Sequence, residues 1–311
     1  MNDEPDHDLT EADAGATRCG FVAVIGATNA GKSTLVNQLV GSKVAIVTHK
    51  VQTTRTRIRG IALEGASQIV FVDTPGIFKP KRRLDRAMVG AAWGGAADAD
   101  IVILLVDAVK GLTGDVDRIV AGLQKERRKA VLVLNKVDEA PRPALLKAAT
   151  VLNETGIFTD TFMISALTGD GVPDLRRFIA EKLPKSPWLY PEDQVADVPM
   201  RSLAAEITRE KLFIRLHEEL PYALTVETEK WEELKDKSIR IEQVIFVQRE
   251  SQRKIALGKD GQTIKAVGQS ARKDLEEMMG VRVHLFLFVK VREGWADDRA
   301  RYREMGLDFT D

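Results

Sequence analysis

The stretch GATNAGKST comprises Gly26, Ala27, Thr28, Asn29, Ala30, Gly31, Lys32, Ser33 and Thr34, and it places two glycines five residues apart before a lysine and a serine. The apolar run FVAVI (21–25) precedes it, and STLVNQLVG (33–41) continues it with helical character. Glycines let the backbone turn so that successive N–H groups face phosphate oxygens, and the following helix dipole attracts the same charge. This pattern is a P-loop, in which Lys32 reaches the outer phosphates and the Ser33 hydroxyl ligates Mg²⁺.

Around this loop, from residue 21 to about 183, short β-rich runs alternate with longer helical patterns. The expected strands are 21–26, 58–63, 68–73, 101–107, 130–135 and 161–165. Several are apolar on both faces, as strands of a parallel sheet covered by helices are. The order predicts a doubly wound α/β domain over residues 18–184, with a mostly parallel six-stranded sheet and its ligand at the carboxyl ends of the strands.

The motif NKVD (135–138) identifies the base of the nucleotide. The Asp138 carboxylate only accepts hydrogen bonds, and guanine offers it two adjacent donors that adenine lacks. An unpaired carboxylate would be costly, so ATP is disfavoured. We expect Lys136 to lie along the base and Asn135 to tie the base loop to the P-loop. The SAL motif (Ser165, Ala166 and Leu167) would offer N–H groups to the guanine oxygen.

The triphosphate end of the nucleotide is assigned from two further segments. DTPG consists of Asp73, Thr74, Pro75 and Gly76 and follows the strand 68–73. Asp73 is expected to hold Mg²⁺ through water, and the Gly76 N–H to sense the γ-phosphate. The first switch is expected at Gln52, Thr53, Thr54, Arg55 and Thr56. Thr53 and Thr54 are candidates for a second Mg²⁺ ligand, unless the segment is an ordinary solvated loop; Lys32, Thr54 and Gly76 are the expected catalytic groups.

The residue after DTPG is Ile77, where many GTP hydrolases carry a glutamine that orients the attacking water. Isoleucine cannot hydrogen-bond water, so either other groups position the water or a partner or cation stimulates the reaction. The amide oxygen of Asn29 suits a K⁺ ion beside the phosphates, although Asn29 could simply brace the loop. Mg²⁺ is thus the expected cofactor of a slow GTPase, with K⁺ as a hypothesis.

A different organisation begins at residue 183. Four prolines within 183–199 exclude helix interior and central strand, so 185–200 is a predicted linker. An amphipathic helix at 201–220, alternating strands at 222–230 and 239–249, two short helices and a strand at 281–291 predict an α-β-β-α-α-β domain over residues 201–292. Residues 1–17 are expected to be a disordered acidic tail, and 293–311 a C-terminal helix or tail.

Between the two short helices lies the second glycine loop, GKDG. GxxG in this topology is typical of KH domains, which use it to hold about four nucleotides of a single strand. The expected RNA-binding residues are Ile255, Gly258, Lys259, Asp260, Gly261, Gln262, Ile264, Lys265 and Arg272, with Ile245 and Val267 completing an apolar groove for bases. Residues 249–273 hold seven basic and two acidic side chains, a local patch that favours RNA over a plain helix-capping turn. Basic stretches at 43–59 and 79–83 indicate either further ribonucleoprotein contact or surface solubility.

Composition narrows the class of protein. The formal net charge is zero, and a single cysteine, Cys19, excludes an intramolecular disulfide. Four histidines show no zinc-site spacing, and the apolar runs are too short to span a bilayer. We expect a soluble intracellular protein.

The chain resembles the Era family of bacterial GTPases over roughly residues 20–306. The motifs that carry this resemblance are GATNAGKS, QTTR, DTPG, NKVD, SAL, YPEDQVADVP, GKDG and VREGWADD. The resemblance implies a type II KH domain that binds the 3′ end of 16S ribosomal RNA, and a role in assembly of the 30S subunit with the pre-30S particle as partner. It also implies a cytoplasmic protein with peripheral association with the inner membrane; we further expect a monomer. Asp260 departs from the more basic loop centre common in the family.

We therefore expect a nucleotide-gated RNA-binding GTPase whose hydrolysis is slow and stimulated by RNA, a partner or a monovalent cation. Because of Ile77, a non-hydrolysing nucleotide-gated RNA-binding scaffold is the alternative.

Overall fold

The computed structural model describes residues 17–50, 53–55, 58–80, 82–217, 220–294, 299, 302 and 307–309. Residues 1–16 of the expected tail 1–17, and the switch residues Gln52 and Thr56, lie outside this range. The chain forms two compact units: Met1–Ser42, Arg59–Asp73 and Gly94–Asp197 make up the first, and Lys43–Ile58, Thr74–Trp93 and Val198–Asp311 the second. Two segments of the N-terminal half are therefore part of the same unit as the C-terminal half.

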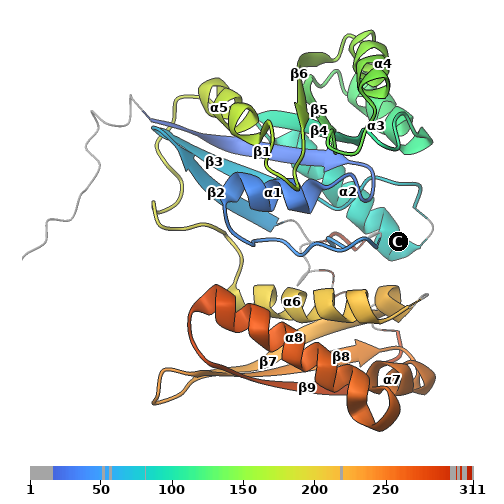
Figure 1. Ribbon diagram of the computed structural model, residues 1–311, viewed down its shortest axis with the longest axis vertical. Helices are drawn as coiled ribbons and strands as arrows, with labels where there is room; N and C mark the ends of the chain where they lie inside the picture. Colours follow the sequence, from blue (N-terminus) through green and yellow to red (C-terminus); the bar gives the residue numbers. More distant parts are fainter. Residues whose placement is uncertain are drawn as a thin grey trace, which may run out of the picture. The chain divides into compact units, whose positions relative to one another are not determined.

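The six strands of the N-terminal half form one sheet in the order β2-β3-β1-β4-β5-β6 (Figure 1). Their bounds are β1 Arg18–Gly26, β2 Ile58–Glu64, β3 Ser67–Asp73, β4 Ile101–Asp107, β5 Ala130–Asn135 and β6 Phe158–Ile164. The pairs from β3 through β6 are parallel. Only two residues join β2 to β3, a connection that antiparallel strands alone allow. The predicted mostly parallel six-stranded sheet is confirmed.

Helices cover this sheet and connect its strands. They are α1 Lys32–Val40, α2 Arg83–Asp98, α3 Gly114–Lys125, α4 Arg142–Asn153 and α5 Val172–Lys182. Every residue of β3 and β5 is buried, as expected of parallel strands covered on both faces. In α3 the Thr113 hydroxyl accepts a hydrogen bond from the Val116 N–H and caps the helix. The carboxyl ends of β1, β3, β5 and β6 each lead into a predicted nucleotide loop.

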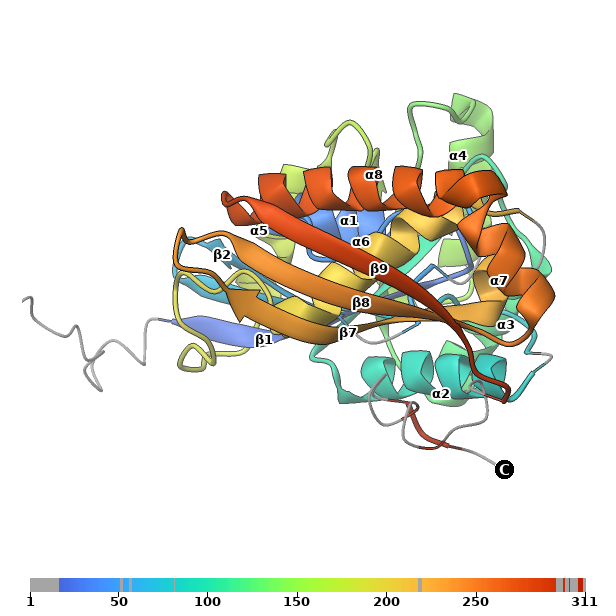
Figure 2. The ribbon, with the colours of Figure 1, turned by 90° about the horizontal axis from the view of Figure 1, so that it is seen from below.

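The C-terminal half has the predicted α-β-β-α-α-β order. Its elements are α6 Met200–Arg215, β7 Leu224–Glu233, β8 Ile239–Val247, α7 Glu250–Leu257, α8 Gln262–Met279 and β9 Val283–Val291. The sheet order is β7-β8-β9, with β8 antiparallel to β7 and parallel to β9. Figure 2 shows α6 and α8 behind the same face of this sheet, where both contribute to its apolar core.

Two helices differ in length from the prediction. Helix α6 ends at Arg215, because Leu216 takes an extended conformation, and a 3₁₀ turn follows at Leu220–Ala223. Leu216 and Leu220 are nevertheless buried, as the apolar pattern predicted. The second helix of the predicted short pair, α8, has 18 residues, so it is not short.

The proline-rich stretch after α5 lies against strands of the first unit. Gln68 of β3 accepts hydrogen bonds from the Leu189 and Tyr190 N–H groups, at 2.8 and 3.0 Å. Arg59 of β2 pairs with Asp197 at 2.9 Å, and the Tyr190 hydroxyl donates to the same carboxylate. These bonds lower the pKa of Asp197, the one from Tyr190 most. Within the described residues, no helix is long and apolar enough to cross a membrane.

Candidate functional site

The P-loop curls where only glycine fits. Gly26 ends β1 with φ 159°, and Gly31 precedes α1 with φ 97°. A Cβ atom on Gly26 would overlap the carbonyl oxygen of Leu105, and one on Gly31 would overlap the side-chain amide of Asn135. Both glycines are therefore required by close packing as well as by backbone conformation.

Lys32 and Ser33 occupy the first turn of α1, directly behind the loop. The Lys32 ammonium donates to the carbonyl oxygens of Gly26 and Ala27, at 3.1 and 2.9 Å. Burial lowers the pKa of Lys32 to about 8, although the Asp73 carboxylate acts in the opposite direction. The ammonium thus lies inside the turn whose N–H groups would surround the phosphates.

Ser33 and Asp73 meet, although they are forty residues apart. The Ser33 hydroxyl donates to Oδ2 of Asp73 at 2.7 Å, and Asp73 is fully buried at the end of β3. A serine hydroxyl beside one carboxylate fits Mg²⁺, which is usually held by one or two carboxylates together with waters and substrate phosphates. Both predicted ligands are therefore in contact.

The guanine-binding motifs are linked through Asn135. Its side-chain amide donates to the Ala30 carbonyl at 2.8 Å, and its side-chain oxygen accepts from the Ala166 N–H at 2.9 Å. This residue therefore joins the P-loop, the NKVD loop and the SAL loop, as predicted for the first two. Asp138 is exposed, and Leu167 of the SAL motif is 75% exposed.

Asp107 is a site residue that the sequence interpretation missed. Its Oδ2 accepts from the Lys136 ammonium at 2.6 Å, and its Oδ1 accepts from the N–H groups of Val109 and Lys110. It orients Lys136, which has a positive φ of 68°. The register pairs Asp107 with Asn135, so an aspartate at the end of β4 was the available signal.

The segment after Asp73 and the first switch both belong to the second unit. Residues 74–77 are buried, and Ile77 is 1% exposed. The Ile77 side chain is apolar and buried, so it cannot orient a water molecule. Thr54 and Arg55 are also buried, at 7% and 3% exposure. The role of Thr54 as a Mg²⁺ ligand stays a prediction.

The basic stretch 43–59 does not present free charge at three of its cations. Lys43 pairs with Glu210 at 2.7 Å and with Asp274 at 3.1 Å. Lys50 donates to the carbonyl oxygens of Phe213 and Leu216, and Arg55 is buried. The protein itself provides partners for these three residues, so they are not simply solubilising charges, and ribonucleoprotein contact by this stretch stays a prediction.

The GKDG loop joins α7 to α8, and three of its four residues have positive φ. Gly258 has φ 75° and ψ 175°, Asp260 has φ 51°, and Gly261 has φ 74°. The side chains predicted to bind RNA at Lys259, Asp260, Gln262, Lys265 and Arg272 are exposed. Ile255 is 57% exposed, and Ile264 packs partly against the core.

Two apolar residues assigned to the base groove were placed wrongly. Ile245 and Val267 are completely buried in the core between α6, α8 and the sheet. Amphipathic periodicity identifies an inward-facing position, but it does not distinguish the core from a groove. The apolar contribution at this loop is therefore restricted to Ile255 and the exposed edge of Ile264.

Comparison with known proteins agrees with both halves of the chain. Residues 21–136 match the 50S ribosome-binding GTPase family, and residues 219–296 match the KH domain. GTPase Era of Rhizobium meliloti (strain 1021) is 65% identical over 300 residues, covering 96% of this chain and 96% of the relative. GTPase Era of Brucella suis biovar 1 (strain 1330) is 64% identical over 299 residues, with the same coverage of each chain.

Two solved structures share the whole architecture. One is a single-residue variant of Aquifex aeolicus Era bound to GDP and AlF₄⁻, and the other is Era in complex with MgGDPNP and nucleotides 1506–1542 of 16S ribosomal RNA. Each has a TM-score of 0.87 and 35% identity, and each alignment covers 93% of this chain and 99% of that one. This chain belongs to the Era family of GTPases.

Proposed function

We propose that this protein is a GTP-hydrolysing switch that binds the 3′ end of small-subunit ribosomal RNA through its KH domain and promotes maturation of the 30S subunit. The proposal rests mainly on the alignment along 93% of the chain with a structure that holds both a magnesium-bound GTP analogue and a 16S fragment. The Ser33–Asp73 contact and the exposed GKDG loop supply the matching local chemistry.

In the proposed nucleotide site, the backbone N–H groups of residues 26–34 surround the phosphates and Lys32 balances charge that develops during phosphoryl transfer. Ser33, Thr54 and, through water, Asp73 hold Mg²⁺. The bound ion neutralises charge on the β- and γ-phosphate oxygens. The Gly76 N–H senses the γ-phosphate, and Thr74, Pro75 and Ile77 complete that loop. Asp138 selects guanine by accepting two hydrogen bonds.

The attacking water needs a group other than Ile77, whose side chain is buried. We propose that Asn29, half-buried with φ 62° in the P-loop, holds K⁺ beside the phosphates. The experiment is multiple-turnover GTP hydrolysis with Mg²⁺ in KCl and in NaCl. Equal rates would exclude the cation role, and the Asn29→Ala variant should remove any difference.

In the proposed RNA site, the GKDG backbone approaches the phosphodiester chain, and Lys259, Lys265 and Arg272 supply positive charge. Binding of a 3′-terminal 16S oligonucleotide should weaken about tenfold or more in Lys259→Glu, because a like charge replaces a phosphate partner. Unchanged affinity would refute this assignment. No hydrolysis under any salt or RNA condition would instead favour the non-hydrolysing scaffold.

We also propose domain boundaries at 18–184, 185–200, 201–292 and 293–311. A cytoplasmic monomer with peripheral association with the inner membrane is a further proposal, based on family resemblance. Sedimentation and membrane fractionation test it directly.

A further inference from the structure

We propose that Arg209 and Arg55 hold residues 53–55 against helix α6 and thereby oppose binding of magnesium-bound GTP. The inference depends on the proposed role of Thr54, which lies between the two residues that these arginines fix. It assigns to the first helix of the KH domain a direct effect on the nucleotide site.

One face of α6 provides the contact surface. Four residues of α6 lie on one side of the helix, because they are spaced three or four residues apart: Glu206, the adjacent pair Arg209 and Glu210, and Phe213. Each of them contacts the segment 43–55 or a residue that does. The segment is thus fixed along about two turns of α6 and not at a single point.

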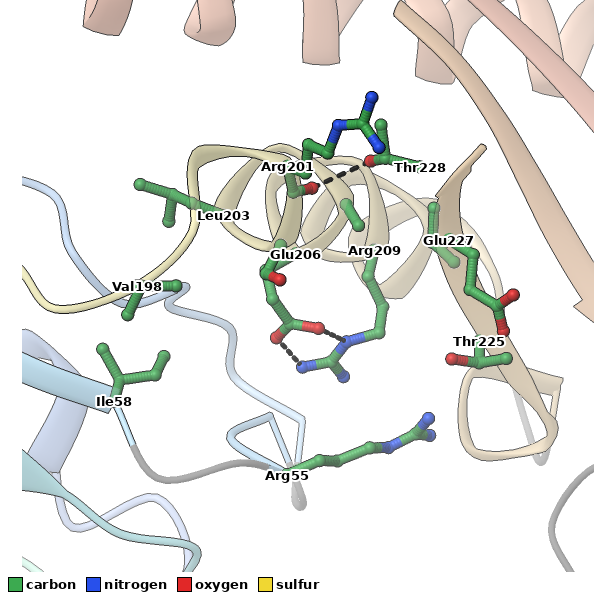
Figure 3. Close-up of a pocket in the computed structure, with 13 residues that line it drawn as sticks. Arg55, Ile58, Val198, Arg201, Leu203, Glu206, Arg209, Thr225, Glu227 and Thr228 are labelled. Carbon is green, nitrogen blue, oxygen red and sulfur yellow. Dashed lines mark hydrogen bonds and ion pairs between the residues drawn. The ribbon is translucent and has the colours of Figure 1, made fainter. Parts of the chain in front are cut away.

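Arg209 makes the central contact between α6 and the segment. It is 1% exposed, its Nε donates to Glu206 at 2.7 Å, and its Nη2 donates to the carbonyl oxygen of Thr53. The guanidinium lies 5.0 Å from the centre of the Phe213 ring. Figure 3 shows Glu206 and Arg209 paired on the α6 side, with Arg55 approaching from the other side. The backbone next to Thr54 is therefore held by a buried charged group.

Arg55, which belongs to the docked segment, makes the second set of hydrogen bonds. Its guanidinium donates to the carbonyl oxygens of Leu224, Tyr222 and Pro221, at 2.7, 3.2 and 3.3 Å. Burial lowers the pKa of Arg55 to about 9, and the positive charge of Arg209 acts in the same direction. Undocking of residues 53–55 would withdraw this guanidinium from three acceptors.

Contacts of Val47, Lys43 and Lys50 fix the rest of the segment to α6. The Val47 N–H donates to Glu210 at 2.9 Å, and the Lys43 ammonium pairs with the same carboxylate. Lys50 donates to the carbonyl oxygens of Phe213 and Leu216 at the end of α6, where the helix has unsatisfied acceptors. Lys50 is only half-buried, so it can be replaced with little damage to the core.

A cavity of about 370 Å³ adjoins these groups, lined by both arginines, Glu206 and Thr225 among others (Figure 3). Close-packed cores transmit every displacement, whereas side chains beside a cavity can change rotamer without moving their helix. The hydrogen bonds of Arg209 and Arg55 can therefore break while α6 keeps its place on the sheet.

The consequence for nucleotides follows from linkage. A ligand that needs Thr54 away from α6 must supply the free energy of undocking, whereas a ligand that does not need Thr54 is unaffected. In this proposal Thr54 leaves α6 to reach Mg²⁺ beside the phosphates of GTP, whereas GDP does not need Thr54. The docked segment should therefore lower the affinity for GTP relative to GDP.

The test is equilibrium binding of GDP and of a non-hydrolysable GTP analogue to the full chain in Mg²⁺. Arg209→Met keeps the packing on Phe213 but removes the bond to Thr53, and Lys50→Gln removes a less buried contact. Each should raise the affinity for the analogue relative to GDP, by roughly five- to twenty-fold for Arg209→Met and less for Lys50→Gln. Adding Thr54→Ala to Arg209→Met should abolish the gain, which a purely structural role would not predict.

Arg215→Met is the matched control, because this exposed arginine of α6 bonds only to Ser270 at 3.4 Å among the contacts described. Its relative affinity should equal that of the unaltered protein. An unchanged or lower ratio in both test variants overturns the inference. If Arg209→Met does not fold, Lys50→Gln decides alone. Failure of the unaltered protein to bind either nucleotide would refute the proposed function instead, so the two failures are distinguishable.

Discussion

Gly258 and Gly261 share one loop but differ in what an added methyl group would meet. Gly258 has φ 75° and ψ 175°, a region reserved for glycine, and a Cβ there would lie 2.7 Å from Thr263 Cβ and 2.9 Å from its backbone nitrogen. Strain of about 1–3 kcal/mol and overpacking of about 1–3 kcal/mol give a loss of roughly 2–6 kcal/mol for Gly258→Ala. Gly261 has φ 74° and ψ 12° and nothing within 4 Å, so Gly261→Ala should lose only about 1–2 kcal/mol.

Urea unfolding of the full-length variants measures these differences, and binding of a 3′-terminal 16S oligonucleotide measures the consequence for RNA. Gly261→Ala should remain folded yet bind RNA about tenfold more weakly, because the methyl group occupies the space that a phosphate would approach. Gly280→Ala is the matched control, since Gly280 has the same conformation (φ 67°, ψ 12°) and open surroundings at the other end of α8. Equal destabilisation by Gly258→Ala and Gly261→Ala would refute the steric argument, and full RNA affinity of Gly261→Ala would refute the assigned contact.

Asp138→Asn should weaken GTP binding by about a hundredfold or more and favour xanthosine triphosphate, because an amide replaces one acceptor with a donor; competition binding checks this. With the pKa of Lys32 lowered to about 8, GTP affinity should be level below that pH and fall above it by up to about tenfold per pH unit, since the ammonium must regain its proton. Calorimetry at about pH 9 should then show proton uptake on binding, and its absence would contradict the shift. Tyr302→Ala should destabilise the second unit by about 3–5 kcal/mol, because Tyr302 is fully buried against Met88 and Phe309; an unchanged melting temperature would contradict this packing.

The sequence predicted the strands well because their apolar residues are locally continuous. All six expected strands of the first half exist, with ends within a few residues, and the loops after them carry the P-loop, DTPG, NKVD and SAL motifs. Each motif requires a particular backbone at a strand end, so local chemistry suffices to place it. The end of α6 was harder, since Leu216 to Leu220 keep the apolar pattern after the helical backbone has stopped.

The docking of residues 43–55 was not predictable from local pattern. Lys50 and Arg55 bond to backbone carbonyl oxygens more than 160 residues away, and a carbonyl leaves no trace in side-chain composition. Burial of a charged group is also rare, so basic residues were interpreted as solvent-facing. The acidic partners Glu210 and Asp274 offered a signal, but many other acidic residues of the chain offered the same one.

If docking of residues 53–55 on α6 opposes GTP binding, as we propose, the coupling between the nucleotide and the KH domain has a definite sign. Residues 43–58, which hold Thr54, and residues 74–93, which hold Gly76, both belong to the compact unit of the KH domain. Helix α2, which starts soon after DTPG, packs with Tyr302, Leu307 and Phe309 near the C-terminus. If undocking of Thr54 costs GTP a given factor in affinity, then GTP must weaken the contacts to α6 by the same factor. An RNA that favours the undocked state would accordingly strengthen GTP binding, and one that favours the docked state would strengthen GDP binding. The effect of RNA on the ratio of GTP affinity to GDP affinity therefore indicates whether the RNA favours residues 53–55 docked on α6 or released from it.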